Sequence, residues 1–211
     1  MESGKGRFLS RTPELPEEYT RAIGSEEINA LPLRRFEGEI YLVRTEGQRK
    51  AAIKRLRAER VLGFDTETRP TFRKGQPQHP PALVQLAGSD CVYLFQISLL
   101  PFSDGLLDLL ADVALLKAGV SVRDDLKGLK SLAPFEEAGF LDLGEVARTL
   151  KMQTHGLRGL AANLLGFRIS KGAQCTNWAR TNLSAQQIAY AATDAWVSRE
   201  IYLAMQRLGV V

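Results

Sequence analysis

Short apolar runs alternate with amphipathic segments along most of the chain. Apolar runs that end at glycine, proline or charged residues predict strands at residues 39–44, 61–68, 82–87, 91–97 and 114–122. Apolar residues spaced three and four apart predict helices at residues 48–60, 106–112, 124–132, 145–150, 157–165 and 184–208. Ser184 is the predicted N-cap of the last helix, and from residue 140 onward, including the run 140–143, we predict only helices. The alternation of strands and helices predicts an α/β fold.

Residues 1–33 lack this pattern. They carry scattered charges and Pro13, Pro16 and Pro32, which favour extended backbone. We therefore predict an N-terminal arm at residues 1–33, with one short helix near residues 16–22, and a single domain at residues 34–211.

The composition excludes several classes of protein. Apolar residues make up 45% and charged residues 25% of the chain, which argues against long disorder. No run approaches the roughly 18 apolar residues of a membrane span, and the N-terminus has no apolar run of a secretory signal. Cys91 and Cys175 have no metal-ligand spacing. We expect a cytoplasmic protein with two buried, reduced thiols and no membrane contact, and the net charge of +4 alone identifies no partner.

Two acidic residues end the run at residues 61–68. Asp65 and Glu67 lie two apart, so their side chains leave the same face of a strand about 7 Å apart. Two neighbouring carboxylates are costly to desolvate unless a proton or a cation lies between them, and an all-oxygen pair suits Mg²⁺ or Mn²⁺. The alternative is two solvated residues at a strand end. The following residues 69–81 contain four prolines and predict a loop positioned to contact a ligand.

Tyr190 and Asp194 lie four apart on the last predicted helix and therefore face the same way. Their neighbours Ala191, Ala192 and Ala195 are small enough for another element to approach closely. The alternative is an exposed acid beside a core tyrosine.

A third acidic pair, Asp124 and Asp125, lies at a predicted strand-to-helix junction. Helix capping is a complete explanation for one of them. Asp124 is the better cap by position, which leaves Asp125 free for chemistry.

These three motifs resemble those of the DEDD exonuclease superfamily in its tyrosine-bearing branch, over roughly residues 38–208. The matching residues are Phe64-Asp65-Thr66-Glu67, Asp125-Leu126 and Tyr190-x-x-x-Asp194. Within the branch, residues 117–120 and 175–178 are most similar to ribonuclease D and to the exonuclease domain of the Werner syndrome protein. The proofreading branch has a histidine five residues before its last aspartate, where this chain has Ala189. The resemblance implies a ribonuclease H-like fold, a mixed β-sheet flanked by helices.

The resemblance also implies a metal-dependent 3′–5′ exonuclease that releases nucleoside monophosphates from DNA or RNA. Asp65, Glu67, Asp125 and Asp194 would hold two divalent cations, Mg²⁺ or Mn²⁺, about 3.5 to 4 Å apart, with Asp65 bridging both. Tyr190 would orient the attacking water, because a phenol with a pKa of about 10 is a poor base. The backbone of Thr66 would approach the terminal sugar.

The segment before the last motif favours a polyanionic partner. No acidic residue lies between Glu145 and Asp194, whereas the segment contains the basic residues Arg148, Lys151, Arg158, Arg168, Lys171 and Arg180. We predict that Arg168, Lys171 and Arg180 hold phosphates of a nucleic acid with a single-stranded or frayed 3′ end; a solvated basic face is the alternative. Phe72, Phe167 and Trp178 are candidates for base stacking, although most such aromatics belong to a core.

Two other functions are compatible with these residues. One is a non-catalytic nucleic-acid-binding domain that keeps the fold, and the other is an endonuclease of ribonuclease H type. The retained carboxylates and Tyr190 favour the exonuclease, because a domain without turnover has no physical need for a costly acidic cluster. The residues do not separate DNA from RNA, since that choice depends on contacts to the 2′ position.

Overall fold

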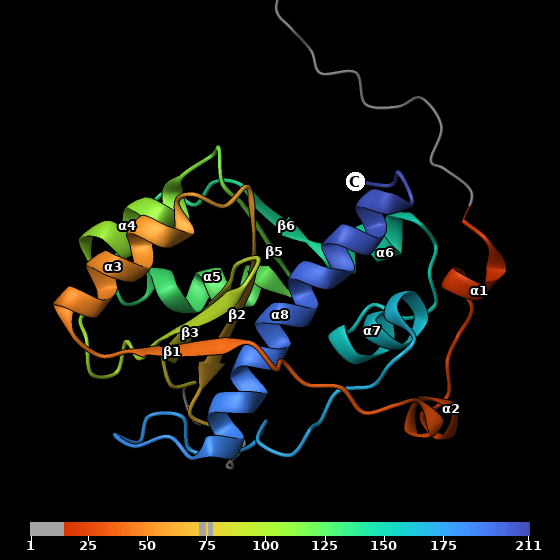
Figure 1. The fold of residues 1–211 in the computed structure, drawn as a ribbon, viewed down its shortest axis with the longest axis horizontal. Helices are drawn as coiled ribbons and strands as arrows, with labels where there is room; N and C mark the ends of the chain where they lie inside the picture. The colour runs from red at the N-terminus through yellow and green to blue at the C-terminus, as the bar shows by residue number, and fades with distance from the viewer. Residues whose placement is uncertain (1–14, 72–74, 76–77) are drawn as a thin grey trace, which may run out of the picture.

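A six-stranded mixed sheet forms the centre of the computed structural model, which describes residues 15–71, 75 and 78–211 (Figure 1). The strands are β1 (Glu39–Val43), β2 (Val61–Thr68), β3 (Pro81–Ala87), β4 (Cys91–Phe95), β5 (Leu116–Gly119) and β6 (Phe140–Asp142), in the order β1-β4-β3-β2-β5-β6. The pairs β2–β3 and β3–β4 are antiparallel, and the pairs β1–β4, β2–β5 and β5–β6 are parallel. The predicted α/β fold with a mixed sheet is confirmed.

Helices cover both faces of the sheet (Figure 1). One face carries α3 (Glu46–Leu56), α4 (Asp104–Ala111) and α5 (Val122–Lys130), and the other carries α6 (Leu143–Thr149), α7 (Leu157–Leu165) and α8 (Ala185–Arg207). Side chains alternate along β2, so Leu62 and Phe64 pack into the core between the sheet and α3, α4 and α5, while Gly63 faces α8. A Cβ at Gly63 would lie 1.8 Å from the backbone oxygen of Ala195, so glycine is what lets α8 cross β2 this closely.

Most predicted elements are present, and the differences have local causes. β2 and α7 have the predicted bounds, whereas β5 is shorter than the predicted 114–122. The chain leaves the sheet at Ser121, whose φ of 62° is left-handed. The sequence predicts helix at β6, because three residues are too few to display the period of a strand. The segment is a strand because Phe140–Asp142 pairs with Lys117–Gly119.

The N-terminus of α5 corrects one prediction. Its N-cap is Ser121, and the Asp142 carboxylate at the end of β6 accepts hydrogen bonds from the backbone N–H groups of Ser121 (3.3 Å) and Val122 (3.0 Å). The prediction that Asp124 caps this helix is therefore wrong. Asp124 lies within the first turn of α5, after the N-cap, and a neighbouring strand supplies the acceptor instead.

The arm contains two helices, α1 (Glu17–Thr20) and α2 (Ser25–Ala30). α1 falls within the predicted short helix at 16–22. α2 was not predicted, because it buries no residue and so shows no apolar face in the sequence. The backbone N–H of Gln153 donates a 2.8 Å hydrogen bond to the carbonyl of Thr20, which ties the arm to the helical layer. Residues 1–14 of the predicted arm, and residues 72–74 and 76–77 of the predicted loop at 69–81, lie outside the described residues.

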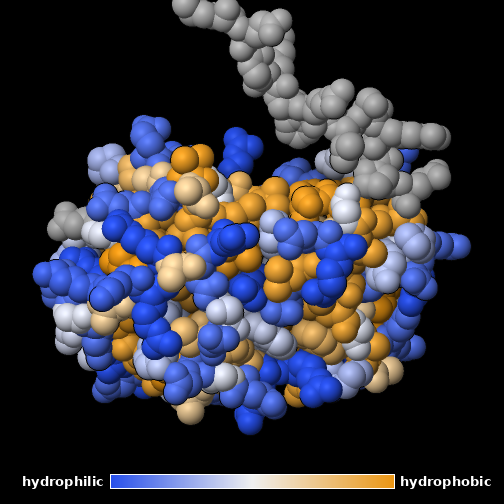
Figure 2. Space-filling view, turned by 45° about the horizontal axis from the view of Figure 1, so that its top comes forward, coloured by the Kyte–Doolittle hydropathy of each residue, from blue (hydrophilic) through white to orange (hydrophobic). Residues whose placement is uncertain are grey.

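The surface mixes hydrophilic and hydrophobic side chains, as Figure 2 shows for one face. Exposed large apolar side chains occur at separate positions: Leu33, Leu99, Val113, Leu132 and Val211. Cys91 is buried in β4 as predicted, but Cys175 is exposed, so the prediction of two buried thiols is wrong for Cys175. Among the described residues, the helices lack the combination of length and hydropathy that a bilayer crossing requires.

Candidate active site

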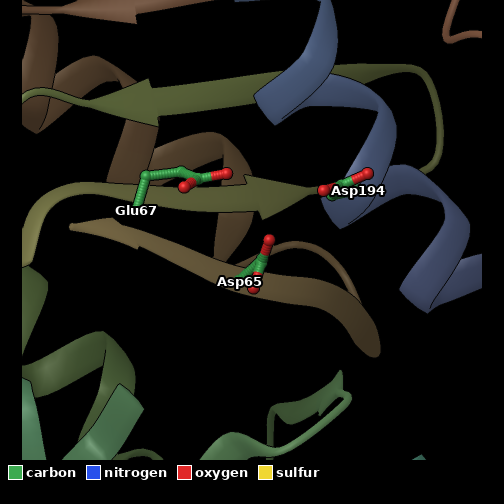
Figure 3. A group of neighbouring side chains, drawn as sticks. All are labelled: Asp65, Glu67 and Asp194. Atoms are coloured by element: carbon green, nitrogen blue, oxygen red, sulfur yellow. The ribbon is translucent and has the colours of Figure 1, made fainter. Parts of the chain in front are cut away.

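Three carboxylates from two elements converge on the α8 side of the sheet. Asp65 and Glu67 come from the end of β2, and Asp194 comes from α8, which lies close to the strand at Gly63. One carboxylate oxygen of each acid lies within 4.8 Å of those of the other two, and Figure 3 shows the three side chains pointing toward one another. Glu67 and Asp194 are buried. The spacing of two on a strand and the small residues of α8 thus bring together acids about 130 residues apart in the sequence.

Asp125 lies beside this group and has a partner of its own. Its Oδ1 accepts a 2.5 Å hydrogen bond from the hydroxyl of Thr66, the residue between Asp65 and Glu67. The charge of Asp125 still reaches Asp65, since it contributes to raising the pKa of Asp65. The structure therefore places Asp125 at the site, outside the three-carboxylate group.

Burial favours the protonated forms of these acids, and repulsion between the carboxylates adds to this effect at Asp65 and Glu67. Burial, then the charges of Asp125, Asp194 and Glu67, raises the pKa of Asp65 well above its usual range. Burial and neighbouring carboxylates raise the pKa of Glu67 to about 9. Burial likewise raises the pKa of both Asp125 and Asp194 to about 7.

No acid of this cluster forms an ion pair with another described residue. Buried carboxylates without a cationic side chain must bind protons or a cation. Oxygen-only donors are the ligands that Mg²⁺ and Mn²⁺ prefer. The residues present therefore fit a divalent cation site.

Tyr190 lies one turn before Asp194 on α8 and lines the same hollow as the carboxylates. Its ring packs against Trp178, with 5.9 Å between the ring centroids. Burial and the charges of Asp194 and Glu67 raise the pKa of Tyr190, so its phenol stays neutral. Trp178 is fully buried and thus supports the tyrosine ring; it is not available to stack on a base.

A cavity of about 390 Å³ lies over the carboxylates, and two basic side chains line it. Arg158 and Lys171 share this lining with Asp65, Glu67 and Asp194. The guanidinium of Arg158 is positioned by a 3.2 Å hydrogen bond from its Nε to the carbonyl of Ile169, and its charge lowers the pKa of Asp194. The site predicted from sequence omitted Arg158, because nothing in the spacing of the six basic residues shows which of them line the cavity.

The other two predicted phosphate ligands lie elsewhere. The Nε of Arg168 donates a 3.1 Å hydrogen bond to the carbonyl of Leu31 in the arm. Arg180 is exposed, and its backbone carbonyl accepts a 2.8 Å hydrogen bond from Nε2 of Gln96. Neither residue is among those lining the cavity over the carboxylates, and their role in binding substrate stays a prediction.

Comparison with known proteins places this site in a family. The family model described as 3′-5′ exonuclease matches residues 40–209. The bifunctional 3′-5′ exonuclease/ATP-dependent helicase WRN of Mus musculus is 36% identical over 155 residues, a match covering 71% of this chain and only 11% of that protein. This chain therefore corresponds to a small part of that relative.

Solved structures agree with this result. The Nibbler EXO domain of Aedes aegypti is similar with a TM-score of 0.74 and 25% identity, covering 84% of this chain and 92% of that chain. The RNase D of Trypanosoma brucei, solved in complex with RNA U12, has a TM-score of 0.70 and 22% identity, covering 81% of this chain and 62% of that chain. The sheet and its flanking helices match the ribonuclease H-like fold of these exonucleases, as predicted. Since the family match runs from the first strand to the last helix, the chain belongs to the 3′-5′ exonuclease family.

Proposed function

We propose that this chain is a metal-dependent 3′–5′ exonuclease that hydrolyses the terminal phosphodiester of a single-stranded or frayed DNA or RNA end and releases nucleoside monophosphates. The observation that carries the proposal is the convergence of Asp65, Glu67 and Asp194 beneath a cavity lined by Arg158 and Lys171. Family membership supports the hydrolase, and the RNA held by the trypanosome RNase D supports a nucleic-acid substrate.

The four acids would hold the cations. Asp65, Glu67 and Asp194 form one compact donor set, and Asp125, oriented by Thr66, would be the fourth ligand. When bound, two divalent cations supply activation of the attacking water and neutralise charge on the phosphate and the leaving oxygen.

The remaining residues position the reactants. The hydroxyl of Tyr190 holds the attacking water by a hydrogen bond and does not take its proton, since the raised pKa keeps the phenol protonated. Arg158 and Lys171, which line the same cavity, pair with the phosphate and offset the negative charge that repels the substrate. The backbone of Thr66 lies between the two strand carboxylates, where the terminal sugar would approach.

Digestion of end-labelled oligonucleotides tests this function. The full chain is incubated with 5′-labelled and with 3′-labelled DNA and RNA, with Mg²⁺, Mn²⁺ or EDTA, beside the matched variant Asp65→Asn. We expect the 3′ label to leave first as a mononucleotide, the 5′ label to shorten one residue at a time, and both reactions to stop in EDTA and in the variant. Internal fragments would indicate an endonuclease, and binding without hydrolysis would indicate the non-catalytic alternative.

A further inference from the structure

The segment between α2 and β1 passes across α8 (Figure 1). Its residues line a groove together with Tyr190 and Asp194 of the candidate active site. Residues 33–37 of this segment lie outside the part of the chain that the family model matches, residues 40–209. One side of the groove is therefore formed by residues outside the family match, and the other side by residues between 167 and 196, inside it.

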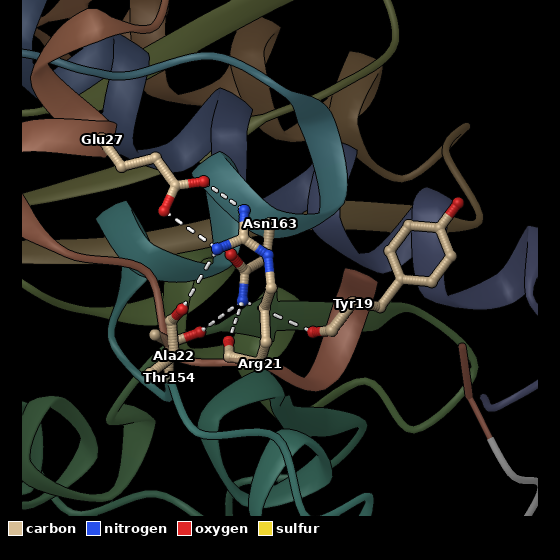
Figure 4. Close-up of polar contacts among 6 residues, drawn as sticks. All are labelled: Tyr19, Arg21, Ala22, Glu27, Thr154 and Asn163. Carbon is tan, nitrogen blue, oxygen red and sulfur yellow. Dashed lines mark hydrogen bonds and ion pairs between the residues drawn. The ribbon is translucent and has the colours of Figure 1, made fainter. Parts of the chain in front are cut away.

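The arm is held in place by hydrogen bonds that fix this segment. Nδ2 of Asn163 on α7 donates to the carbonyls of Arg21 (3.0 Å) and Tyr19 (3.4 Å) and to the hydroxyl of Thr154 (3.0 Å), as Figure 4 shows. Arg21 also pairs with Glu27 on α2. These contacts anchor α1 and α2, so the following residues enter the groove from a fixed point.

The segment itself is tied to two neighbouring elements. The backbone N–H of Arg168 donates to the carbonyl of Pro32 (3.0 Å), and the backbone N–H of Arg34 donates to the carbonyl of Arg168 (2.9 Å). Two residues after Arg34, the backbone N–H of Phe36 donates to the hydroxyl of Thr193 on α8 (3.1 Å). Residues 33–37 are thus a fixed wall.

Two adjoining hollows make up the groove, which we call the arm groove. The first, a cavity of about 510 Å³, lies between residues 33–37 and the first turns of α8, and Tyr190 and Asp194 of the candidate site line it. The second, of about 380 Å³, continues along the arm to Phe36, Phe167 and Trp196. The two hollows share Arg34, Arg35 and Glu37. The arm groove therefore leads from the reaction site outward.

The side chains of the arm groove combine cations with aromatic rings. Arg34 and Arg35 are exposed and form no ion pair within the described part of the chain, and Glu37 offsets only one of their charges. The ring of Trp196 stacks on Phe167 with centroids 5.7 Å apart and contacts Phe36 at 6.0 Å. Guanidinium groups beside partly exposed aromatic rings are the usual chemistry of single-stranded nucleic acid binding, where phosphates pair with the cations and bases stack on the rings.

We propose that the arm groove binds the single-stranded segment upstream of the nucleotide being removed. This proposal rests on the proposed function, because Tyr190 and Asp194 place the groove beside the scissile bond. The terminal nucleotide would occupy the cavity over the carboxylates, which Tyr190 and Asp194 line together with Arg158 and Lys171. The arm groove instead extends over two hollows and suits several consecutive nucleotides.

Binding measured without hydrolysis tests the charges. In an Asp65→Asn background in EDTA, anisotropy of 5′-labelled single strands of 2, 4, 8 and 12 nucleotides, as DNA and as RNA, is followed from low to high salt. The pair Arg34→Gln/Arg35→Gln should weaken binding of the 12-mers about tenfold at low salt and reduce the salt slope by about one to two units, with a smaller loss for shorter strands. The matched control is Lys50→Gln/Lys54→Gln, which removes the same charge from exposed positions on α3. The control should change binding less than about twofold.

Intrinsic fluorescence tests the rings. The chain has two tryptophans, and Trp178 is fully buried while Trp196 is partly exposed in the arm groove. Unlabelled 12-mers should quench the emission of the Asp65→Asn chain, and Trp196→Phe should abolish the quenching. Equal losses of affinity in the arginine and lysine pairs, no loss in either, or quenching that survives Trp196→Phe would overturn the proposal. These readouts are independent of turnover, so failure of the arm groove leaves the end-labelled digestion result intact, and the reverse also holds.

Discussion

Thr66 on β2 donates a 2.5 Å hydrogen bond from its hydroxyl to Oδ1 of Asp125 in the first turn of α5. The bond joins the strand that carries Asp65 and Glu67 to a helix on the opposite face of the sheet. Thr66 thus acts through its side chain, in addition to the backbone role predicted for it. The orientation and the proton affinity of Asp125 both depend on this bond, because burial raises the pKa of Asp125 to about 7 while the Thr66 hydroxyl opposes the rise.

Removing that hydroxyl should shift the pH dependence of activity. Thr66→Val keeps the shape of the side chain and loses the bond, so the pKa of Asp125 rises further and its charged form requires a higher pH. We expect the acidic limb of the kcat/KM profile to move to higher pH by about one unit, with weaker Mg²⁺ binding at pH 7. Thr66→Ser keeps the donor and serves as the control. Identical profiles for the valine variant and the parent chain would contradict this role.

The metal-free protein should lose stability as pH rises. The pKa of Glu67 is about 9 in the folded chain against 4.5 in the unfolded chain, so between these values the folded state holds a proton that the unfolded state has released. The free energy of unfolding therefore falls with rising pH across this window, and Asp125 and Asp194 act in the same direction. Glu67→Gln should abolish most turnover yet raise the free energy of unfolding at pH 8.5 by about 1–3 kcal/mol.

Thermal unfolding in EDTA at pH 5 and pH 8.5 measures this effect. The Tm of the parent chain should be lower at pH 8.5 than at pH 5. The Tm of Glu67→Gln should decrease less between these two pH values. Mg²⁺ should restore the Tm of the parent chain mainly at pH 8.5. A parent Tm that is flat or rises with pH would show that the acids are not destabilised by burial.

Tyr190→Phe should separate positioning of water from metal binding. The variant keeps the ring against Trp178 and removes only the hydroxyl. We expect kcat to fall about 10- to 100-fold while Mn²⁺ affinity, measured by calorimetry, stays within about twofold. If Mn²⁺ affinity falls as far as turnover, the hydroxyl belongs to the metal ligands.

The three basic residues predicted to hold phosphates should behave differently. Lys171→Ala removes a cation from the cavity over the carboxylates, so KM should rise and the salt slope of binding should fall by about one unit. Arg168→Ala removes the hydrogen bond to Leu31 and should lower the free energy of unfolding by about 1 kcal/mol. Arg180→Ala, at an exposed position, should change either quantity little. Uniform effects of the three variants on KM would instead restore the phosphate track predicted from the sequence.

The sequence predicted what depends on local spacing. The apolar run that turns acidic within residues 61–68 predicted the bounds of β2, and the spacing of two predicted the common face of Asp65 and Glu67. The spacing of four placed Tyr190 and Asp194 together. Long-range pairings left no such signal. β6 has three residues and forms only because it pairs with β5. The arm groove requires residues 33–37 to lie against α8, and no local pattern in the sequence encodes that contact.

The most direct test of the two-cation hydrolysis is a sulfur substitution at the 3′-terminal linkage. A single nonbridging phosphate oxygen there is replaced by sulfur, which Mg²⁺ binds poorly and Mn²⁺ tolerates, and single-turnover release of the terminal nucleotide is measured with each metal. We predict that the substitution slows release about tenfold or more in Mg²⁺ for one of the two diastereomers, and that Mn²⁺ restores most of the rate. Equal slowing in both metals, or release that continues in EDTA, would contradict direct contact between a cation held by these carboxylates and the reacting phosphate.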